Sequence, residues 1–244
     1  MGKRLVAFAA AAALVFPAST AAGTAPIEFC AADKTVAPKL VHFRAADGAR
    51  LLGVALGTGH VGVVLSHQLG SDFCEWVPYA RKLSREGYRV LAFSFRGSGS
   101  SDAGSASPAR LDRDVIAAAG ELRRLGARRV AIVGASMGGT ASLVAAPALR
   151  PAPKLVVSLS GPSYFGGLDA SKAVPRFHGP VLFAAGADDD GFPSDARTLY
   201  KASASSAKRL LIVGGADHGS ALVTYHPQVR RVLQAELDKY APLR

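Results

Sequence analysis

The chain has 244 residues and a formal net charge of +11 at pH 7. Its length suffices for one large α/β domain with a full hydrophobic core. A charge of this size can mark a nucleic-acid partner, but the basic residues are scattered over predicted helices, with no aromatic residues between them. We therefore expect a solvated basic surface and no nucleic acid. No zinc-ligand spacing or phosphate-binding loop is present, so neither a metal nor another cofactor is expected.

The N-terminus has the residue order of a secretory signal. Lys3 and Arg4 precede an apolar run over residues 5–16, and small residues follow. The run is too short to span a bilayer, so a retained transmembrane helix is the weaker alternative. Cleavage fits best after Ala22, with Ala21 and Ala25 as alternatives. We expect residues 1–22 to be a signal peptide and residues 23–244 one monomeric domain, secreted or in the periplasm or cell envelope, without stable membrane insertion.

Export changes the interpretation of the two cysteines. Cys30 and Cys74 both lie in the expected mature chain, and an even count outside the cytosol favours a disulfide. Two free thiols are the alternative. A bridge would tie the N-terminal segment to the loop after the third strand.

Strands and helices alternate after an initial hairpin. Residues 38–44 and 50–55 alternate apolar and polar side chains around Asp47-Gly48, a hairpin signal. Residues 62–66 form the next strand, and residues 67–72 a loop. Further strands are predicted at residues 88–95, 155–159, 180–185 and 209–213, and helices at residues 76–86, 108–125, 194–203 and 220–240. Such alternation predicts right-handed crossovers and a mostly parallel sheet with the hairpin at its antiparallel edge.

The segment of residues 128–140, RRVAIVGASMGGT, has the strongest chemical signal. Its apolar run is typical of a strand buried on both faces, and small residues after it can continue as a helix. The spacing Gly134-x-Ser136-x-Gly138 is the nucleophile-elbow pattern. So sharp a turn leaves no room for side chains at its flanks and holds Ser136 strained and exposed. An ordinary serine in a glycine-rich turn is the alternative.

The order of the motifs resembles the α/β-hydrolase family. These motifs are the hairpin, the HQLG loop, the RGSGSSD turn, the GASMGG elbow, GADDDGFP and ADHG, within residues 40–240. The resemblance implies an α/β-hydrolase fold with a central sheet of about eight strands, helices on both faces, and a triad in chain order Ser, acid, His. The short form without a cap domain is similar to dienelactone-hydrolase-like and serine-aminopeptidase-like esterases.

Ser136 needs a base, because a protonated hydroxyl is a poor nucleophile. His42, His60 and His178 lie in or beside predicted strands, and His226 lies within the last helical pattern. His218 follows the last strand, at the sheet edge where open α/β sheets place catalysis. The family's base occupies this position, so His218 is the expected base.

The acid of the triad must orient the imidazole. Asp188, Asp189 and Asp190 all follow the strand at residues 180–185. The family pattern is a glycine, an aspartate three residues later and a proline four after that, which Gly186, Asp189 and Pro193 fit. Asp189 is therefore expected, with Asp188 as the alternative.

An oxyanion hole needs two N–H donors. The resemblance implies the backbone of Met137 and a donor in the loop after the third strand. The family usually has His-Gly there, whereas this chain has His67-Gln68. Because Gln68 carries a Cβ, the second donor stays open between Leu69 and Gln68. His67 is expected to have a structural role.

These residues predict a secreted serine hydrolase of the carboxylesterase type that forms an acyl-enzyme on Ser136 and takes a small-molecule ester. Residues 160–179 are too few and too rich in glycine and proline to build a multi-helix cap, so small or short acyl groups are expected. A peptidase or amidase of the same fold is one alternative. A non-catalytic hydrolase-like envelope protein is the other, favoured only by His67-Gln68. Apolar lining is expected from four residues: Leu69, Phe73, Phe165 and Phe192.

Overall fold

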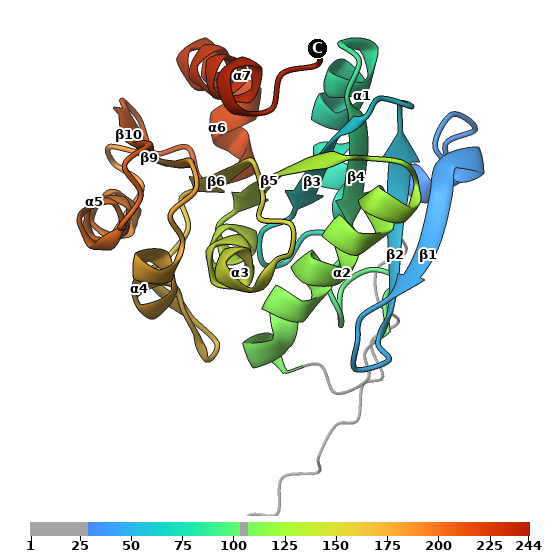
Figure 1. The fold of residues 1–244 in the computed structure, drawn as a ribbon, viewed down its shortest axis with the longest axis horizontal. Coiled ribbons are helices and arrows are strands. Elements are labelled where there is room, and N and C mark those ends of the chain that lie inside the picture. The colour runs from blue at the N-terminus through green and yellow to red at the C-terminus, as the bar shows by residue number, and fades with distance from the viewer. Residues whose placement is uncertain (1–28, 103–106) are drawn as a thin grey trace, which may run out of the picture.

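A central sheet of eight strands organises the chain (Figure 1). The computed structural model describes residues 29–102 and 107–244, and the signal peptide predicted at residues 1–22 lies outside this range. The strands are β1 (Leu40–Arg44), β2 (Arg50–Leu56), β3 (Val61–Ser66), β4 (Arg89–Phe93), β5 (Arg129–Ala135), β6 (Leu155–Leu159), β9 (Val181–Gly186) and β10 (Lys208–Val213). Their order across the sheet is β1-β2-β4-β3-β5-β6-β9-β10.

Only β2 runs against the other strands of this sheet. It pairs antiparallel with both β1 and β4, whereas all other neighbours in the sheet are parallel. The N-terminal hairpin is therefore at the edge, as predicted, and its turn includes Asp47 and Gly48. Because the other strands are parallel, the carboxyl ends of β3, β4, β5, β6, β9 and β10 meet at one edge. Every residue predicted to act in catalysis follows one of these ends.

Helices cover both faces of the sheet (Figure 1). The helices are α1 (Val77–Arg85), α2 (Leu111–Arg124), α3 (Met137–Ala145), α4 (Ala170–Ala173), α5 (Phe192–Ala202), α6 (Ser220–Tyr225) and α7 (Pro227–Tyr240). Apolar residues of α1, α6 and α7 share one core cluster, and those of α2 and α3 share another on the opposite face. Helix α5 joins α3 and α4 in a third cluster. Because side chains alternate between the two faces along a strand, each strand contributes to both core layers. On β3, Val63 packs on the first face and Val64 on the second.

The last predicted helix is two helices. Residues 220–240 are predicted as one, but the helix ends at Tyr225 and α7 begins at Pro227. His226 between them has φ −105° and ψ 102°, an extended conformation. The reason is steric, because the ring of a proline disfavours the helical conformation in the residue before it.

The interval between β6 and β9 holds no multi-helix cap. It contains a two-stranded hairpin of β7 (Tyr164–Phe165) and β8 (Leu168–Asp169), the single turn α4, and a short 3-10 turn, Val174–Arg176. This small insertion agrees with the interpretation of residues 160–179 as too short for a cap. Across the described residues, no helix combines the length and apolar character that a bilayer crossing requires.

The N-terminal segment is tied to the domain by the disulfide Cys30–Cys74, with a Cα–Cα distance of 5.6 Å. The predicted bridge is thus present in the structure. Cys74 lies on the 3-10 turn Phe73–Trp76, directly after β3 and its loop. The turn is anchored in the core, since Phe73 and Trp76 are fully buried.

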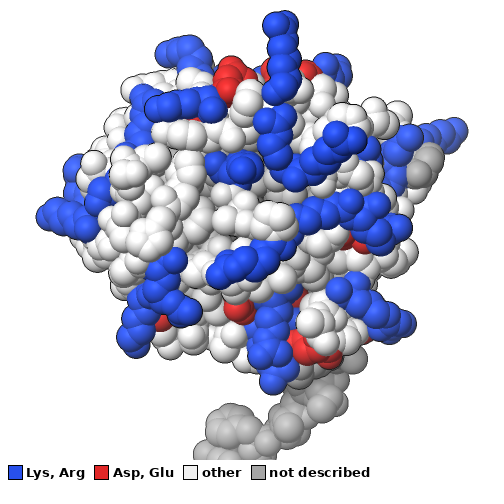
Figure 2. All heavy atoms as spheres, in the orientation of Figure 1, with Lys and Arg blue, Asp and Glu red and all other residues white. Residues whose placement is uncertain are grey.

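Lys and Arg side chains are spread over the whole face shown in Figure 2. Uncharged surface separates many of them in that view. The picture agrees with a solvated basic surface.

Candidate active site

Ser136 lies at the turn between β5 and α3 with φ 48° and ψ −118°. A positive φ in a residue other than glycine costs roughly 1–3 kcal/mol, so the surroundings must enforce it. The Ser136 N–H donates to the carbonyl of Leu159 on β6 at 2.8 Å, and the carbonyl of Ser136 accepts from Thr140 N–H at 3.1 Å. Ser136 is only 9% exposed, less than the exposed position predicted, because other loops at this sheet edge approach the elbow.

The two glycines of the motif are required sterically. A Cβ on Gly134 would lie 2.3 Å from the carbonyl oxygen of Gly138, across the elbow. A Cβ on Gly138 would lie 2.5 Å from the carbonyl oxygen of Ser66 at the end of β3. The absence of both side chains lets the start of α3 pack directly against β3. This contact brings the N-terminus of the helix, at Met137, beside the loop that follows β3.

Asp189 and His218 lie together at the same sheet edge. Nδ1 of His218 is 3.0 Å from both Oδ1 and Oδ2 of Asp189. An ionised carboxylate only accepts hydrogen bonds, so Nδ1 carries the proton and Nε2 is left as the basic nitrogen. Asp189 is 6% exposed, and the hydroxyl of Ser160 also donates to its Oδ2 at 2.6 Å. The arrangement suits a carboxylate that orients a base.

The competing acids and bases are placed elsewhere. Asp188 and Asp190 are exposed in the loop after β9. Among the histidines, His42, His60 and His178 are exposed, and Nε2 of His226 contacts the carboxylate of Asp217 at 2.8 Å. The structure therefore pairs the expected base with the expected acid, and with neither neighbouring aspartate.

The loop carrying His218 reaches the elbow. A Cβ on Gly219, which has φ +56°, would lie 3.3 Å from Cβ of Ala135 and 2.3 Å from Oε1 of Gln68. Ala135 is the residue before Ser136, and Gly219 is the residue after His218. The loops after β3, β5 and β10 therefore meet at one point.

The loop after β3 is where the chain departs from the family pattern. The ring of His67 is buried, and its Nε2 accepts a hydrogen bond from the N–H of Phe95 at 3.0 Å. Nδ1 therefore carries the proton and donates to the carbonyl of Gln68 at 2.7 Å. Both ring nitrogens are thus engaged in structural bonds. The Gln68 N–H donates to Oε1 of Glu75 at 3.1 Å. Of the two expected donors in this loop, Gln68 is therefore already used and Leu69 is left.

Comparison with known proteins identifies the architecture. Residues 62–161 match the family model described as alpha/beta hydrolase fold. The solved structure of an esterase from Pyrococcus furiosus has a TM-score of 0.73 to this chain, with 18% identity, covering 83% of this chain and 90% of that chain. The chain has the α/β-hydrolase fold.

Two further solved hydrolases share this fold. A thermophilic esterase from Thermogutta terrifontis has a TM-score of 0.67 at 17% identity, covering 82% of this chain and 98% of that chain. A dienelactone hydrolase from Anabaena variabilis has a TM-score of 0.65 at 21% identity, covering 83% of this chain and 99% of that chain. None of the curated proteins matches the chain. The resemblance inferred from the motifs is confirmed for the fold.

A small pocket adjoins the elbow of this α/β-hydrolase fold. It has a volume of about 160 Å³, and Met137 and Leu69 lie in its wall with Phe165. Leu69 is 67% exposed at its mouth.

Phe192 packs on the other side of the site, against the imidazole of His218, with ring centroids 4.3 Å apart. Phe73, also expected as lining, is fully buried in the core instead. A larger cavity, about 790 Å³, lies between β1 and α2, and no residue of the expected site lines it.

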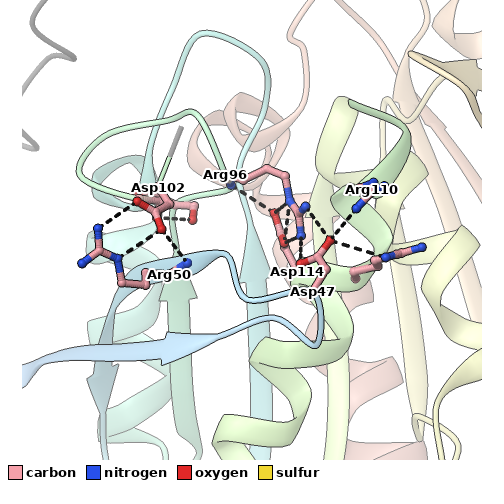
Figure 3. Close-up of polar contacts among 9 residues, drawn as sticks. Asp47, Arg50, Arg96, Asp102, Arg110 and Asp114 are labelled. Carbon is pink, nitrogen blue, oxygen red and sulfur yellow. Dashed lines mark hydrogen bonds and ion pairs between the residues drawn. The ribbon is translucent and has the colours of Figure 1, made fainter. Parts of the chain in front are cut away.

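The loop after β4 forms another wall of the small pocket and is held by buried charges (Figure 3). Arg96 is 2% exposed and donates to Asp114 on α2, which is 0% exposed, and to Asp47 in the β1–β2 turn. Burial disfavours the charged guanidinium, but the two carboxylates outweigh it and raise the pKa of Arg96. Hydrogen bonds from Arg96 hold the pKa of Asp47 well below its usual range. Burial raises the pKa of Asp114.

Sequence patterns did not predict three residues that contribute to the site: Ser160, Glu75 and Arg96. Each is set by tertiary contacts between distant segments, such as the bond of Ser160 to Asp189, 29 residues away. Arg96 carries the only signal, because it opens the RGSGSSD turn that the resemblance already used. No group of three or more His, Cys, Asp or Glu side chains suited to a metal occurs among the described residues.

Proposed function

We propose that the protein is an exported, monomeric serine hydrolase that cleaves carboxylic esters through an acyl-enzyme on Ser136. The observation that carries the proposal is the pair of His218 and Asp189 at 3.0 Å, on loops that converge on the strained elbow of Ser136. Esterases among the structures of the same fold support the reaction class. The disulfide and the signal-like N-terminus support export.

In the proposed first step, Nε2 of His218 takes the proton of the Ser136 hydroxyl while Oγ forms a bond to the ester carbonyl carbon. The carbonyl π electrons move to oxygen, and the N–H groups of Met137 and Leu69 stabilise that negative oxygen. Asp189 holds the imidazole by its Nδ1–H and stabilises its charge. Collapse of the tetrahedral intermediate breaks the bond to the alcohol oxygen, which leaves with the proton from Nε2.

In the second step a water molecule attacks the acyl group on Ser136. His218 again accepts a proton at Nε2 and returns it to Oγ, so the acid product leaves and the enzyme is restored. The small pocket beside Met137, about 160 Å³, favours a small or short acyl group.

A panel of p-nitrophenyl esters and peptide p-nitroanilides tests this proposal, with Ser136→Ala as the control. We expect turnover of short-chain esters, little turnover of the anilides, and no turnover by the variant. Anilide turnover above ester turnover would replace the esterase by the amidase alternative. If neither substrate class is turned over, the non-catalytic alternative gains support.

A further inference from the structure

The loop that replaces the usual His-Gly sequence is braced by a carboxylate. Glu75 lies on the 3-10 turn Phe73–Trp76, and its Oε1 accepts the N–H of Gln68 at 3.1 Å. The hydroxyls of Ser71 and Ser220 lie near this carboxylate and act to lower its pKa. Glu75 thus holds the backbone of the loop after β3 and lies near the start of α6.

The side chain of Gln68 adds a second brace, from the loop after β3 to the start of α6. Its Oε1 accepts the N–H of Ser220 at 3.3 Å. The same oxygen lies so close to Gly219 that a Cβ there would be 2.3 Å away. Gln68 is the residue before the proposed donor Leu69, and Ser220 is two residues after His218. The side chain of Gln68 therefore connects the proposed oxyanion loop, which Glu75 holds, to the loop of the proposed base.

The 3-10 turn that carries Glu75 is anchored on both sides of this residue. Cys74, the preceding residue, is held by the disulfide to Cys30, and its N–H donates to the side chain of Asp72 at 2.7 Å. Phe73 and Trp76 on either side are fully buried. Glu75 therefore projects from a fixed point.

We propose that Glu75 is a positioning residue, whose ionised carboxylate fixes the Gln68 backbone, and through the Gln68 side chain Ser220, so that Leu69 N–H and His218 face the same reacting carbonyl. The inference rests on the proposed function. In the ionised state both carboxylate oxygens accept, which suits the N–H of Gln68. In the protonated state one oxygen becomes a donor and the group loses its charge, so the hydrogen bond from the Gln68 N–H weakens.

The protonation state of Glu75 should therefore change near neutral pH. Burial is the largest cause that raises the pKa of Glu75 to about 7, and the charge of Asp72 adds to it. The hydroxyls of Ser71 and Ser220 and the N–H of Gln68 act in the opposite direction. The other titratable groups on the adjoining loops are His67, Asp217 and His218. Activity should therefore depend on the ionisation of Glu75 as well as on that of the proposed base.

The test uses ester hydrolysis by the full mature protein in a pH-stat, with a fluorophosphonate label for Ser136. In the wild type we expect log kcat/KM to approach a slope of 2 on the acid side, because two groups must be deprotonated. Glu75→Gln keeps an acceptor for Gln68 N–H but cannot ionise, so its slope should be 1. Its kcat at pH 8 should fall about tenfold with KM little changed, less than the 10²–10³ that a lost oxyanion donor costs.

Glu86→Gln is the matched control, since this glutamate is exposed at the end of α1 and pairs only with Lys82 in the described contacts. It should keep the wild-type kcat and slope. Gln68→Gly leaves the backbone donor to Glu75 but removes the brace to Ser220, and should lower kcat with KM little changed. If Glu75→Gln does not fold, the pH profile of the wild type decides, and an acid-side slope of 1 overturns the role of Glu75.

The failures of the two proposals differ. A wild type that neither takes the label at Ser136 nor hydrolyses esters overturns the proposed function. A wild type that does both, with Glu75→Gln equal to it in kcat and in slope, overturns the positioning role alone.

Discussion

The two sides of the candidate active site are held in place by different means. The nucleophile side depends on the backbone: Ser136 is strained between β5 and α3, and Gly134 and Gly138 leave no space for a Cβ. The oxyanion side depends on side chains: Gln68 and Glu75 brace the loop after β3 by hydrogen bonds.

The difference explains how each side can vary. A close backbone contact admits only glycine, so the elbow carries a short motif in the sequence. A loop held by side-chain hydrogen bonds can be built from several combinations of residues, which leaves no fixed motif. The replacement of His-Gly by His67-Gln68 is compatible with a braced loop for this reason. The predictions below test the two sides in turn.

The largest effect is expected for the acid of the nucleophile side. Asp189→Asn should lower kcat by about 10³–10⁴-fold, because the imidazole of His218 loses its orientation and its charge partner. Asp188→Asn is the matched control and should leave kcat nearly unchanged, since this side chain is exposed. Steady-state kinetics on a short-chain ester measure both. A larger loss of kcat in Asp188→Asn than in Asp189→Asn would identify Asp188 as the acid.

The next effect concerns the loop after β4, on the oxyanion side of the pocket. Arg96→Ala should lower the free energy of unfolding by about 3–5 kcal/mol, because it leaves Asp114 buried without its partner. Arg50→Ala removes the exposed ion pair to Asp102 in the same loop and should change little (Figure 3). Urea denaturation of both variants measures the difference. Equal, small losses would show that the buried network does not hold the loop.

Removing the disulfide should have a somewhat smaller effect. The bridge joins residues 44 apart, for which the chain-entropy model gives about 4 kcal/mol, and measured gains are often less. The double variant Cys30→Ser/Cys74→Ser should melt at a lower temperature and lose some kcat, while Ser136 still takes a fluorophosphonate label. Unchanged kcat would show that the turn under Glu75 does not need the bridge. Intact mass of the wild type, with and without reductant, checks that the bridge forms.

The smallest effect is expected for the length of the acyl group. Each fully buried methylene contributes about 0.8 kcal/mol, but the pocket beside Met137 has a volume of only about 160 Å³. In a p-nitrophenyl ester series, kcat/KM should rise over the first short chains and then stay level. A steady rise as far as palmitate would require an enclosed acyl tunnel that neither side of the site provides.

Periodicity and glycine spacing predicted most of this fold. The strand pattern, the hairpin at Asp47-Gly48 and the elbow follow from local rules, and the structure confirms them. The break of the last helix at His226 was missed, although Pro227 carried the signal.

The pairing of Asp189 with His218 was expected only through the resemblance, and sequence spacing alone could not choose among the three aspartates. The proposed role of Glu75 could not be predicted, because it depends on contacts among three segments that only the folded chain brings together. Such contacts leave no periodic trace. The oxyanion side is therefore the part of the site that required the structure.

The most direct test of the account is covalent labelling of the folded protein with a fluorophosphonate, followed by peptide mapping. The account predicts one modified residue, Ser136, and no labelling in a Ser136→Ala variant that unfolds at the wild-type temperature. Labelling that persists in this variant, or a folded wild type that takes no label, would contradict the assignment of Ser136 as an activated nucleophile.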